Sequence, residues 1–236
     1  MLPIRDINPT RITPVVTLAL IAINIAVFFL FQMRGTALEQ QELVYERAAI
    51  ACEVTTGAPL GIDEILDEVC LPGAQAPVFP NKNVFLALFT SMFLHGSVAH
   101  VLFNMWFLWI FGNNVEEAFG HVGYLFFYLI GGLAATAVYV ALNPDSTVPL
   151  VGASGAIAVA LGAYAVLFPG RRVLSLVGWF LIPVPAAVFL AIWFALQFVA
   201  GQTGVAWEAH AGGFVFGAGV TLLMRSRLLR RVAIAS

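Results

Sequence analysis

Five side chains able to take part in chemistry lie in otherwise apolar stretches: His95, His100, Asn104, Ser154 and His210. Polar and ionisable groups are costly at membrane depth, so each is a candidate for function. A hydroxyl beside an imidazole forms a nucleophile with a general base, and N–H groups nearby can stabilise a developing oxyanion. Four of them, His100, Asn104, Ser154 and His210, are expected to converge at one depth, which predicts a catalytic or transport site.

Spacing indicates how these groups meet. His100 and Asn104 are four residues apart and therefore share one helix face. Ser154 lies in Gly152-Ala153-Ser154-Gly155, at a helix start whose backbone N–H groups are free. Stripes of small residues let membrane helices approach closely. Two such stripes would place Ser154 and His210 at the same end of one contact. Their members are Ser154, Ala158 and Gly162 on one helix, and Gly213 and Gly217 on the other.

Other intramembrane chemistries can be tested against the sequence. A zinc protease would need His-Glu-x-x-His, but no histidine is followed by glutamate. An aspartyl protease needs two membrane aspartates, and none of Asp6, Asp63, Asp67 and Asp145 lies in a predicted span. A Ser–His dyad without a buried acid remains among proteases, and it needs no metal or cofactor. A small transporter is the alternative from another class. It is disfavoured because the predicted spans hold no charged residue apart from Glu208, near the start of the stretch 205–224, and because no inverted repeat is evident.

The composition explains why these groups count as intramembrane. The chain has 236 residues, of which 61% are hydrophobic and 10% charged, and its mean hydropathy is +0.93. Soluble domains carry about 25% charged residues. The chain is therefore predicted to be a polytopic membrane protein in contact with the lipid bilayer. Its 11 basic and 13 acidic residues nearly cancel, which gives no indication of a nucleic-acid partner.

Uncharged stretches predict an all-α fold with six membrane-spanning helices, since a span needs about 20 apolar residues. Residues 84–94 are too short to cross and are expected to lie in the interface or to dip into the membrane and out again. The expected organisation is a segment 1–13, a membrane domain 14–224 with a long external loop at about 34–82, and a basic tail 225–236. The six spans are 14–33, 98–115, 122–142, 151–168, 186–200 and 205–224.

Basic residues predict the orientation. Eight of the 11 fall on the face that holds both termini, so the positive-inside rule places the termini in the cytoplasm of a plasma (inner) membrane and the 34–82 loop outside. Cys52 and Cys70 both lie in this loop. A disulfide between them is a candidate if the loop faces an oxidising compartment, and two unpaired thiols are the alternative.

Taken together, the motifs resemble the rhomboid intramembrane serine proteases. The matching pieces are His95-x4-His100-x3-Asn104, Gly152-Ala153-Ser154-Gly155 and Ala209-His210-x2-Gly213-x3-Gly217. The resemblance implies a six-helix rhomboid bundle with Ser154 as nucleophile and His210 as general base and acid. It also implies His100 and Asn104 as oxyanion donors, with the Ser154 N–H. Three residues would have auxiliary roles: Gly152, Gly155 and His95. His95 would lie near a water-filled mouth or, alternatively, make a hydrogen bond that holds a loop.

Two departures from the family pattern stand out. Leu86-Ala87 occupies the place of a common Trp-Arg pair, and Ala158 occupies that of an aromatic residue which stacks on the catalytic histidine. The resemblance also implies substrates that are membrane proteins whose transmembrane segment unwinds easily. They would reach the site through a lateral gap beside the fifth span. The predicted gate is formed by Phe189, Phe194 and Phe198, although a lipid-facing helix shows the same pattern. The alternative within the family is an inactive relative that binds client helices, and retention of both Ser154 and His210 argues against it.

Overall fold

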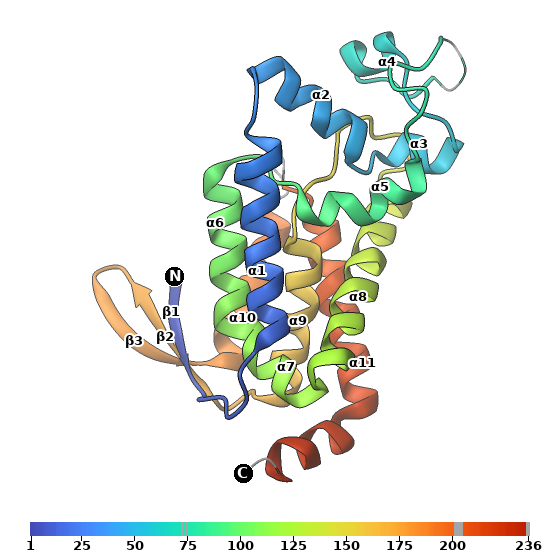
Figure 1. The fold of residues 1–236 in the computed structure, drawn as a ribbon. Helices are drawn as coiled ribbons and strands as arrows, with labels where there is room; N and C mark the ends of the chain where they lie inside the picture. The colour runs from blue at the N-terminus through green and yellow to red at the C-terminus, as the bar shows by residue number, and fades with distance from the viewer. Residues whose placement is uncertain (72, 74, 201–204, 235–236) are drawn as a thin grey trace.

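The chain folds as a helical bundle, and the computed structural model describes residues 1–71, 73, 75–200 and 205–234 of it. A set of short helices covers one end, and a small sheet lies beside the other end (Figure 1). The bundle elements are α1 (Val15–Val27) with the π-helical turn η1 (Phe28–Gln32), α6 (Val98–Phe107) with η3 (Leu108–Gly112), α7 (Asn113–Phe119), α8 (His121–Leu142), α9 (Ser154–Leu167), α10 (Ala186–Ala200) and α11 (Trp207–Ile234).

Length and composition qualify some of these helices as spans. In the described part of the chain, Val15–Gln32 and His121–Leu142 can cross a membrane, and Val84–Phe93 with Val98–Phe119 is a third span if this pair, bent by 77°, counts as one. The bend separates α5 (Val84–Thr90) and η2 (Ser91–Phe93) from α6, as expected for an interfacial 84–94 segment. α9 and α10 are apolar but shorter. The count of six spans stays a prediction.

α9 is the centre of the bundle, and its small residues let α11 lie directly against it. Nearly all of its side chains are buried. A Cβ atom added at Gly162, Gly213 or Gly217 would collide with a backbone carbonyl oxygen of the facing helix. Those carbonyls belong, in the same order, to Phe214, Gly155 and Val159. The two stripes identified in the sequence therefore form the contact between the helices that carry Ser154 and His210.

Glu116 of α7 fixes the start of α1. Its carboxylate is fully buried and accepts hydrogen bonds from the Val16 N–H (2.9 Å), the Thr17 N–H (2.8 Å) and the Thr17 hydroxyl (2.7 Å). These are first-turn groups of α1, which have no partner within their own helix. The carboxylate therefore caps α1 in place of a local side chain and ties it to the bundle.

A three-stranded antiparallel sheet corrects the all-α expectation. β1 (Leu2–Ile7) pairs with β2 (Arg172–Val177), which pairs with β3 (Phe180–Pro185). The segment 1–13 therefore contributes a strand, and Pro183 and Pro185 lie in an edge strand, where a proline's missing N–H costs least. Asp6 of β1 accepts a hydrogen bond from Asn114 Nδ2 (2.6 Å). Burial raises the pKa of Asp6 to about 6.

The C-terminal end is helical. α11 continues through Ile234, so the basic segment predicted as a tail from residue 225 is helical over its described part. Arg231 donates from Nη1 to the Phe119 carbonyl (3.1 Å), which ties this extension to the end of α7. Ala235 and Ser236 lie outside the described residues.

The predicted external loop holds three helices, α2 (Ala37–Arg47), α3 (Ala51–Thr56) and α4 (Ile62–Asp67), which we call the cap. Cys52 and Cys70 are joined in a disulfide, with their Cα atoms 5.9 Å apart. Beneath it, Lys82 Nζ lies 2.5 Å from Glu53 Oε2, and both side chains are buried. Burial raises the pKa of Glu53 and lowers that of Lys82. Each charge of this buried pair is compensated by the other. Removing either side chain would leave an unpaired charge in the protein interior.

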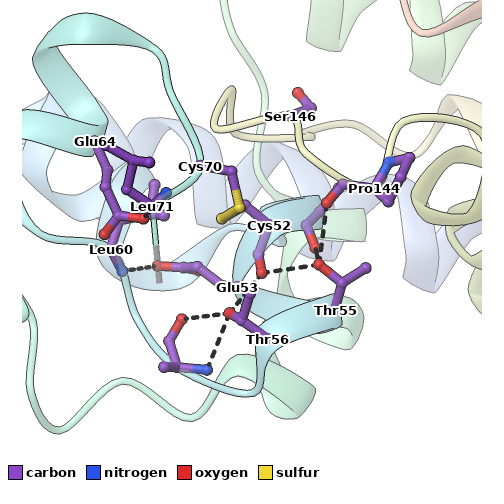
Figure 2. Close-up of a disulfide and its surroundings, with 12 residues drawn as sticks. Cys52, Glu53, Thr55, Thr56, Leu60, Glu64, Cys70, Leu71, Pro144 and Ser146 are labelled. Carbon is purple, nitrogen blue, oxygen red and sulfur yellow. Dashed lines mark hydrogen bonds between the residues drawn. A yellow bond between two sulfur atoms is a disulfide. The ribbon is translucent and has the colours of Figure 1, made fainter. Parts of the chain in front are cut away.

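The cap contacts the loop that leads into α9 (Figure 2). The Cys52 N–H donates to the Ser146 carbonyl (3.0 Å), and the Thr55 hydroxyl donates to the Pro144 carbonyl (3.0 Å). Farther along, the Leu150 N–H donates to the Ala49 carbonyl (2.8 Å). Because Ser154 follows four residues later, the disulfide-linked cap helps to position the start of α9.

Candidate active site

Ser154 and His210 are in hydrogen-bond contact. Ser154 is the first residue of α9, and His210 lies in the first turn of α11. Their separation, from Ser154 Oγ to His210 Nε2, is 2.7 Å. The contact follows from the glycine-mediated packing of α9 on α11, since Gly213, three residues after His210, lies against the Gly155 carbonyl. The pair has the geometry of a nucleophile with its general base.

A cavity of about 560 Å³ opens above this pair. α9 has 14 residues and is therefore about 21 Å long, shorter than the roughly 30 Å hydrocarbon layer. A helix of this length, with Ser154 at its end, can leave room for water above the hydroxyl. The lining is partly polar and comes from several elements, including Ser91, His100, Thr136, Tyr139, Asn143, Ser146 and Glu208.

His100 approaches Ser154 across Gly152. Gly152 has φ +128°, and a Cβ there would lie 2.8 Å from His100 Cε1, 2.9 Å from His100 Nε2 and 3.4 Å from Ser154 Oγ. The backbone N–H of Gly96 donates to His100 Nδ1 (3.4 Å). Since Nδ1 accepts, the neutral ring carries its proton on Nε2. His100 therefore presents a donor toward the site, and only glycine fits at position 152.

The other glycine flanking Ser154 serves packing. A Cβ at Gly155 would lie 3.0 Å from the Ala135 Cβ of α8. Gly155 therefore allows α8 to approach the start of α9. Its carbonyl is also the group that faces Gly213 of α11.

Asn104 lies one helical turn beyond His100 on α6 and is nearly buried, with 7% exposure. Its Nδ2 is buried and has no hydrogen-bond partner among the described residues. A buried donor without a partner costs free energy, which is a reason to look for a transient acceptor. The residue lies outside the described lining of the cavity.

His95 does not line the cavity, so of its two expected roles the place near a water-filled mouth is wrong. Its side chain is fully buried, and its ring packs edge-on against His100 with ring centroids 5.2 Å apart. The backbone N–H of His95 donates to Gln32 Oε1 (2.9 Å), and its carbonyl accepts from Gln32 Nε2. Gln32, at the end of η1, was missed by the sequence reasoning. It holds the segment before α6 in place.

Two residues of α10 contact His210 and were also missed. Gln197 Oε1 lies 2.7 Å from His210 Nδ1, and the Trp193 ring lies beside the imidazole with centroids 6.2 Å apart. Trp193 thus supplies an aromatic neighbour where Ala158 cannot. Ala158 is fully buried, and its Cβ lies 3.3 Å from where a Cβ of Gly213 would be. Gln197 is the one strongly polar side chain in 186–200, a signal that was available in the sequence.

The predicted gate divides into two parts. Phe189 is 1% exposed and stacks on Phe111 of the core, with centroids 5.9 Å apart, so it is not part of a gate. Phe198 is 52% exposed and contacts Trp207 at the start of α11 (5.0 Å). Phe194 contacts Phe214 of α11 (4.9 Å). Of the three phenylalanines, only Phe194 and Phe198 have a described contact with α11.

Leu86 and Ala87 lie in α5, which runs across the bundle end (Figure 1). Leu86 is 53% exposed, whereas Ala87 is buried. With Phe85 and Phe89 also exposed, α5 presents an apolar surface without a charged anchor. Such a helix suits the lipid interface.

One group in the described residues has the composition of a metal site. Cys52, Cys70 and Glu64 bring their ligand atoms within 4.8 Å of one another. The two sulfurs are bonded to each other, so neither offers a thiolate. The Glu64 carboxylate accepts hydrogen bonds from the backbone N–H groups of Gly61 (2.8 Å) and Leu71 (2.8 Å). The group stabilises the cap.

Comparison with known proteins gives consistent matches. The sequence model of the rhomboid domain matches residues 82–227. The chain is 33% identical over 147 residues to the presenilin-associated rhomboid-like protein A, mitochondrial, of Danio rerio, covering 58% of this chain and 37% of that protein. It is 26% identical over 204 residues to rhomboid protease GluP of Bacillus subtilis, covering 86% and 34%. It is 32% identical over 157 residues to rhomboid protease AarA of Providencia stuartii, covering 56% and 53%. The chain thus spans about a third to a half of the length of these relatives.

Proposed function

Because the chain belongs to the rhomboid family, we propose that it is an intramembrane serine endopeptidase in which Ser154 is the nucleophile and His210 the general base. The observation that carries the proposal is the 2.7 Å contact between Ser154 Oγ and His210 Nε2. This contact lies under a partly polar cavity in an otherwise apolar bundle. Neither a pure binder of client helices nor a transporter needs a nucleophile aligned with a base.

The proposed reaction uses the groups of the site in turn. Ser154 Oγ attacks the carbonyl carbon of the peptide bond while its proton passes to His210 Nε2. The carbonyl oxygen becomes an oxyanion, held by the His100 Nε2–H, the Asn104 amide and the Ser154 N–H. The C–N bond then breaks, and the leaving amine takes the proton from His210. Water hydrolyses the acyl ester, giving one proton to His210, which returns it to Ser154.

The proposed substrates are transmembrane segments whose helix is easily unwound. In lipid, the N–H and C=O groups of a helical segment are hydrogen-bonded within the helix, and breaking these hydrogen bonds without water is costly. Substrates with a weak helix near the cavity are therefore favoured. We further propose the six-span topology with cytoplasmic termini from the charge pattern. The matched relatives include mitochondrial and bacterial proteins, which gives no support for a plasma membrane in particular.

Labelling with a fluorophosphonate tests this function without knowledge of the substrate. Purified wild type in detergent is expected to be labelled, with the adduct mapped to Ser154 by mass spectrometry, and Ser154→Ala is expected not to be labelled. Ser146→Ala is the matched control, since Ser146 lines the same cavity and should leave labelling intact. Labelling that persists in Ser154→Ala would refute the assignment. A folded wild type that takes no label would favour the inactive, helix-binding alternative.

The described contacts between α10 and α11 give a prediction about substrate access. Phe198→Ala removes the ring that contacts Trp207 and is expected to raise turnover of a glycine-containing transmembrane reporter in liposomes by about 2- to 5-fold, since gating often limits turnover. Phe189→Ala should instead lower the unfolding temperature, because it empties a core position at a cost of about 3–5 kcal/mol. A Phe198→Ala turnover at or below that of wild type, in folded protein, would contradict a gate at this position.

A further inference from the structure

Gln197 is the polar residue that the proposed dyad does not explain. It lies in α10, a helix whose other side chains are apolar, and is 7% exposed. Both ends of its amide are engaged. Nε2 donates to the Trp193 carbonyl one turn earlier (2.9 Å), and Oε1 lies 2.7 Å from His210 Nδ1. An amide buried in this way is held in one orientation.

The direction of each hydrogen bond follows from that orientation. A backbone carbonyl can only accept, so the amide nitrogen of Gln197 must face Trp193, and its oxygen must face His210. An amide oxygen also only accepts, so Nδ1 of His210 must carry a proton. Nε2 of the neutral ring then has a free lone pair, and this is the atom that faces Ser154 Oγ at 2.7 Å. The chain of donors runs from Ser154 to His210 to Gln197.

We propose that Gln197 is the positioning residue of the site, which holds His210 in the tautomer and ring orientation that let Nε2 accept the Ser154 proton. This inference rests on the proposed function of the dyad. Gln197 occupies the place that a buried carboxylate has in a Ser-His-Asp triad. Because its amide is neutral, it orients the imidazole without adding a negative charge beside it.

Two substitutions of Gln197 separate positioning from simple packing. The measured quantity is the second-order rate of fluorophosphonate labelling of the full chain between pH 5 and 9. Gln197→Leu has similar volume but no acceptor. We expect a rate about 10- to 100-fold lower, the loss seen when the partner that orients a metal-ligating histidine is removed. Gln197→Glu restores an acceptor and should recover at least a third of the wild-type rate at high pH.

The pH profile supplies a readout that packing alone would not move. A carboxylate at 197 favours the protonated imidazole, which cannot accept the Ser154 proton. The midpoint of the acid limb in Gln197→Glu should therefore lie about one pH unit above that of wild type. The other titratable groups in the described lining are His100 on α6, Tyr139 on α8 and Glu208 on α11. All three are unchanged by these substitutions.

Leu196→Ala is the control, because Leu196 neighbours Gln197 on α10 but is 53% exposed on the outer surface. It should label at the wild-type rate. The inference is overturned if wild type takes the label and Gln197→Leu is labelled at the same rate. It is also overturned if both Gln197 variants lose activity and the midpoint does not move, which would indicate a structural role. If wild type itself takes no label, the proposed function fails and this inference fails with it.

Discussion

His210→Ala is expected to lower the rate of fluorophosphonate labelling at Ser154 by about a thousandfold, since general-base catalysis contributes roughly 10²–10⁴. The His210 imidazole is the base that contacts Ser154 Oγ. Without it, water must take the proton of the hydroxyl. Folding should change little. The groups left without His210 are Ser154 Oγ and Gln197 Oε1, and Ser154 borders a cavity that water can occupy. We therefore expect a loss of about 1 kcal/mol in the free energy of unfolding.

His121→Ala serves as the matched control for this experiment. His121 is the histidine at the start of α8, where Nδ1 lies 2.6 Å from Glu116 Oε1, and its side chain is 46% exposed. It lies outside the described lining of the cavity and should leave labelling at the wild-type rate. Gel-based progress curves at fixed pH measure the rates, and thermal unfolding in detergent measures folding. A His210→Ala rate within threefold of wild type would show that another group activates Ser154.

The parts of the site that depend on local packing could be predicted from the sequence. Small residues spaced four apart on both helices, with Gly213 and Gly217 on α11, leave few ways for α9 and α11 to meet, and the contact of Ser154 with His210 follows from this packing. The approach of His100 to Ser154 was expected from the resemblance of the motifs, and the structure adds that only a glycine at 152 leaves space for the imidazole. In both cases small residues limit the geometry to one solution.

The parts that depend on helix rotation could not be predicted. Apart from Gln197, α10 is apolar on every face, so its sequence does not indicate which face is buried. Phe189 therefore entered the predicted gate although it packs on Phe111 in the core. For the same reason, nothing in the spacing placed Gln197 beside His210. A lone polar residue in a membrane helix identifies a candidate, but its partner is known only once the helix is oriented.

The sheet was missed in part because β1 pairs with a distant segment of the chain. β1 contacts β2 from about 170 positions away, with Asp6 opposite Val173, and six-residue strands give a weak signal in isolation. Prolines at 183 and 185 indicated a break, whereas an edge strand accommodates them. The position of His95 was mistaken for a related reason. Its depth is set by Gln32, 63 residues earlier in the chain, through both backbone groups of His95.

Gly217→Ala is expected to be the most damaging single-methyl change in the bundle. A Cβ at this position would collide with the Val159 carbonyl oxygen and would also lie 2.7–2.8 Å from the Val159 backbone carbons. Backbone atoms inside a buried helix cannot rotate away, so α9 and α11 must move apart. Overpacking typically costs about 1–3 kcal/mol and sometimes more, and we expect at least 3 kcal/mol here. Thermal unfolding in detergent should show a drop of several degrees or no folded protein.

Gly219→Ala provides a close comparison, since it adds the same methyl group to the same helix two residues later. A Cβ at Gly219 meets nothing within 4 Å among the described residues. Removing a helical glycine there should be neutral or stabilise the helix by up to about 1 kcal/mol. The two variants also differ in function, because moving α11 away from α9 separates His210 from Ser154. Gly217→Ala should therefore lose fluorophosphonate labelling even where some protein stays folded, whereas Gly219→Ala should label normally. Equal unfolding temperatures for the two variants would mean that the helices are not in backbone contact at Gly217, and the geometric basis for the dyad would weaken with it.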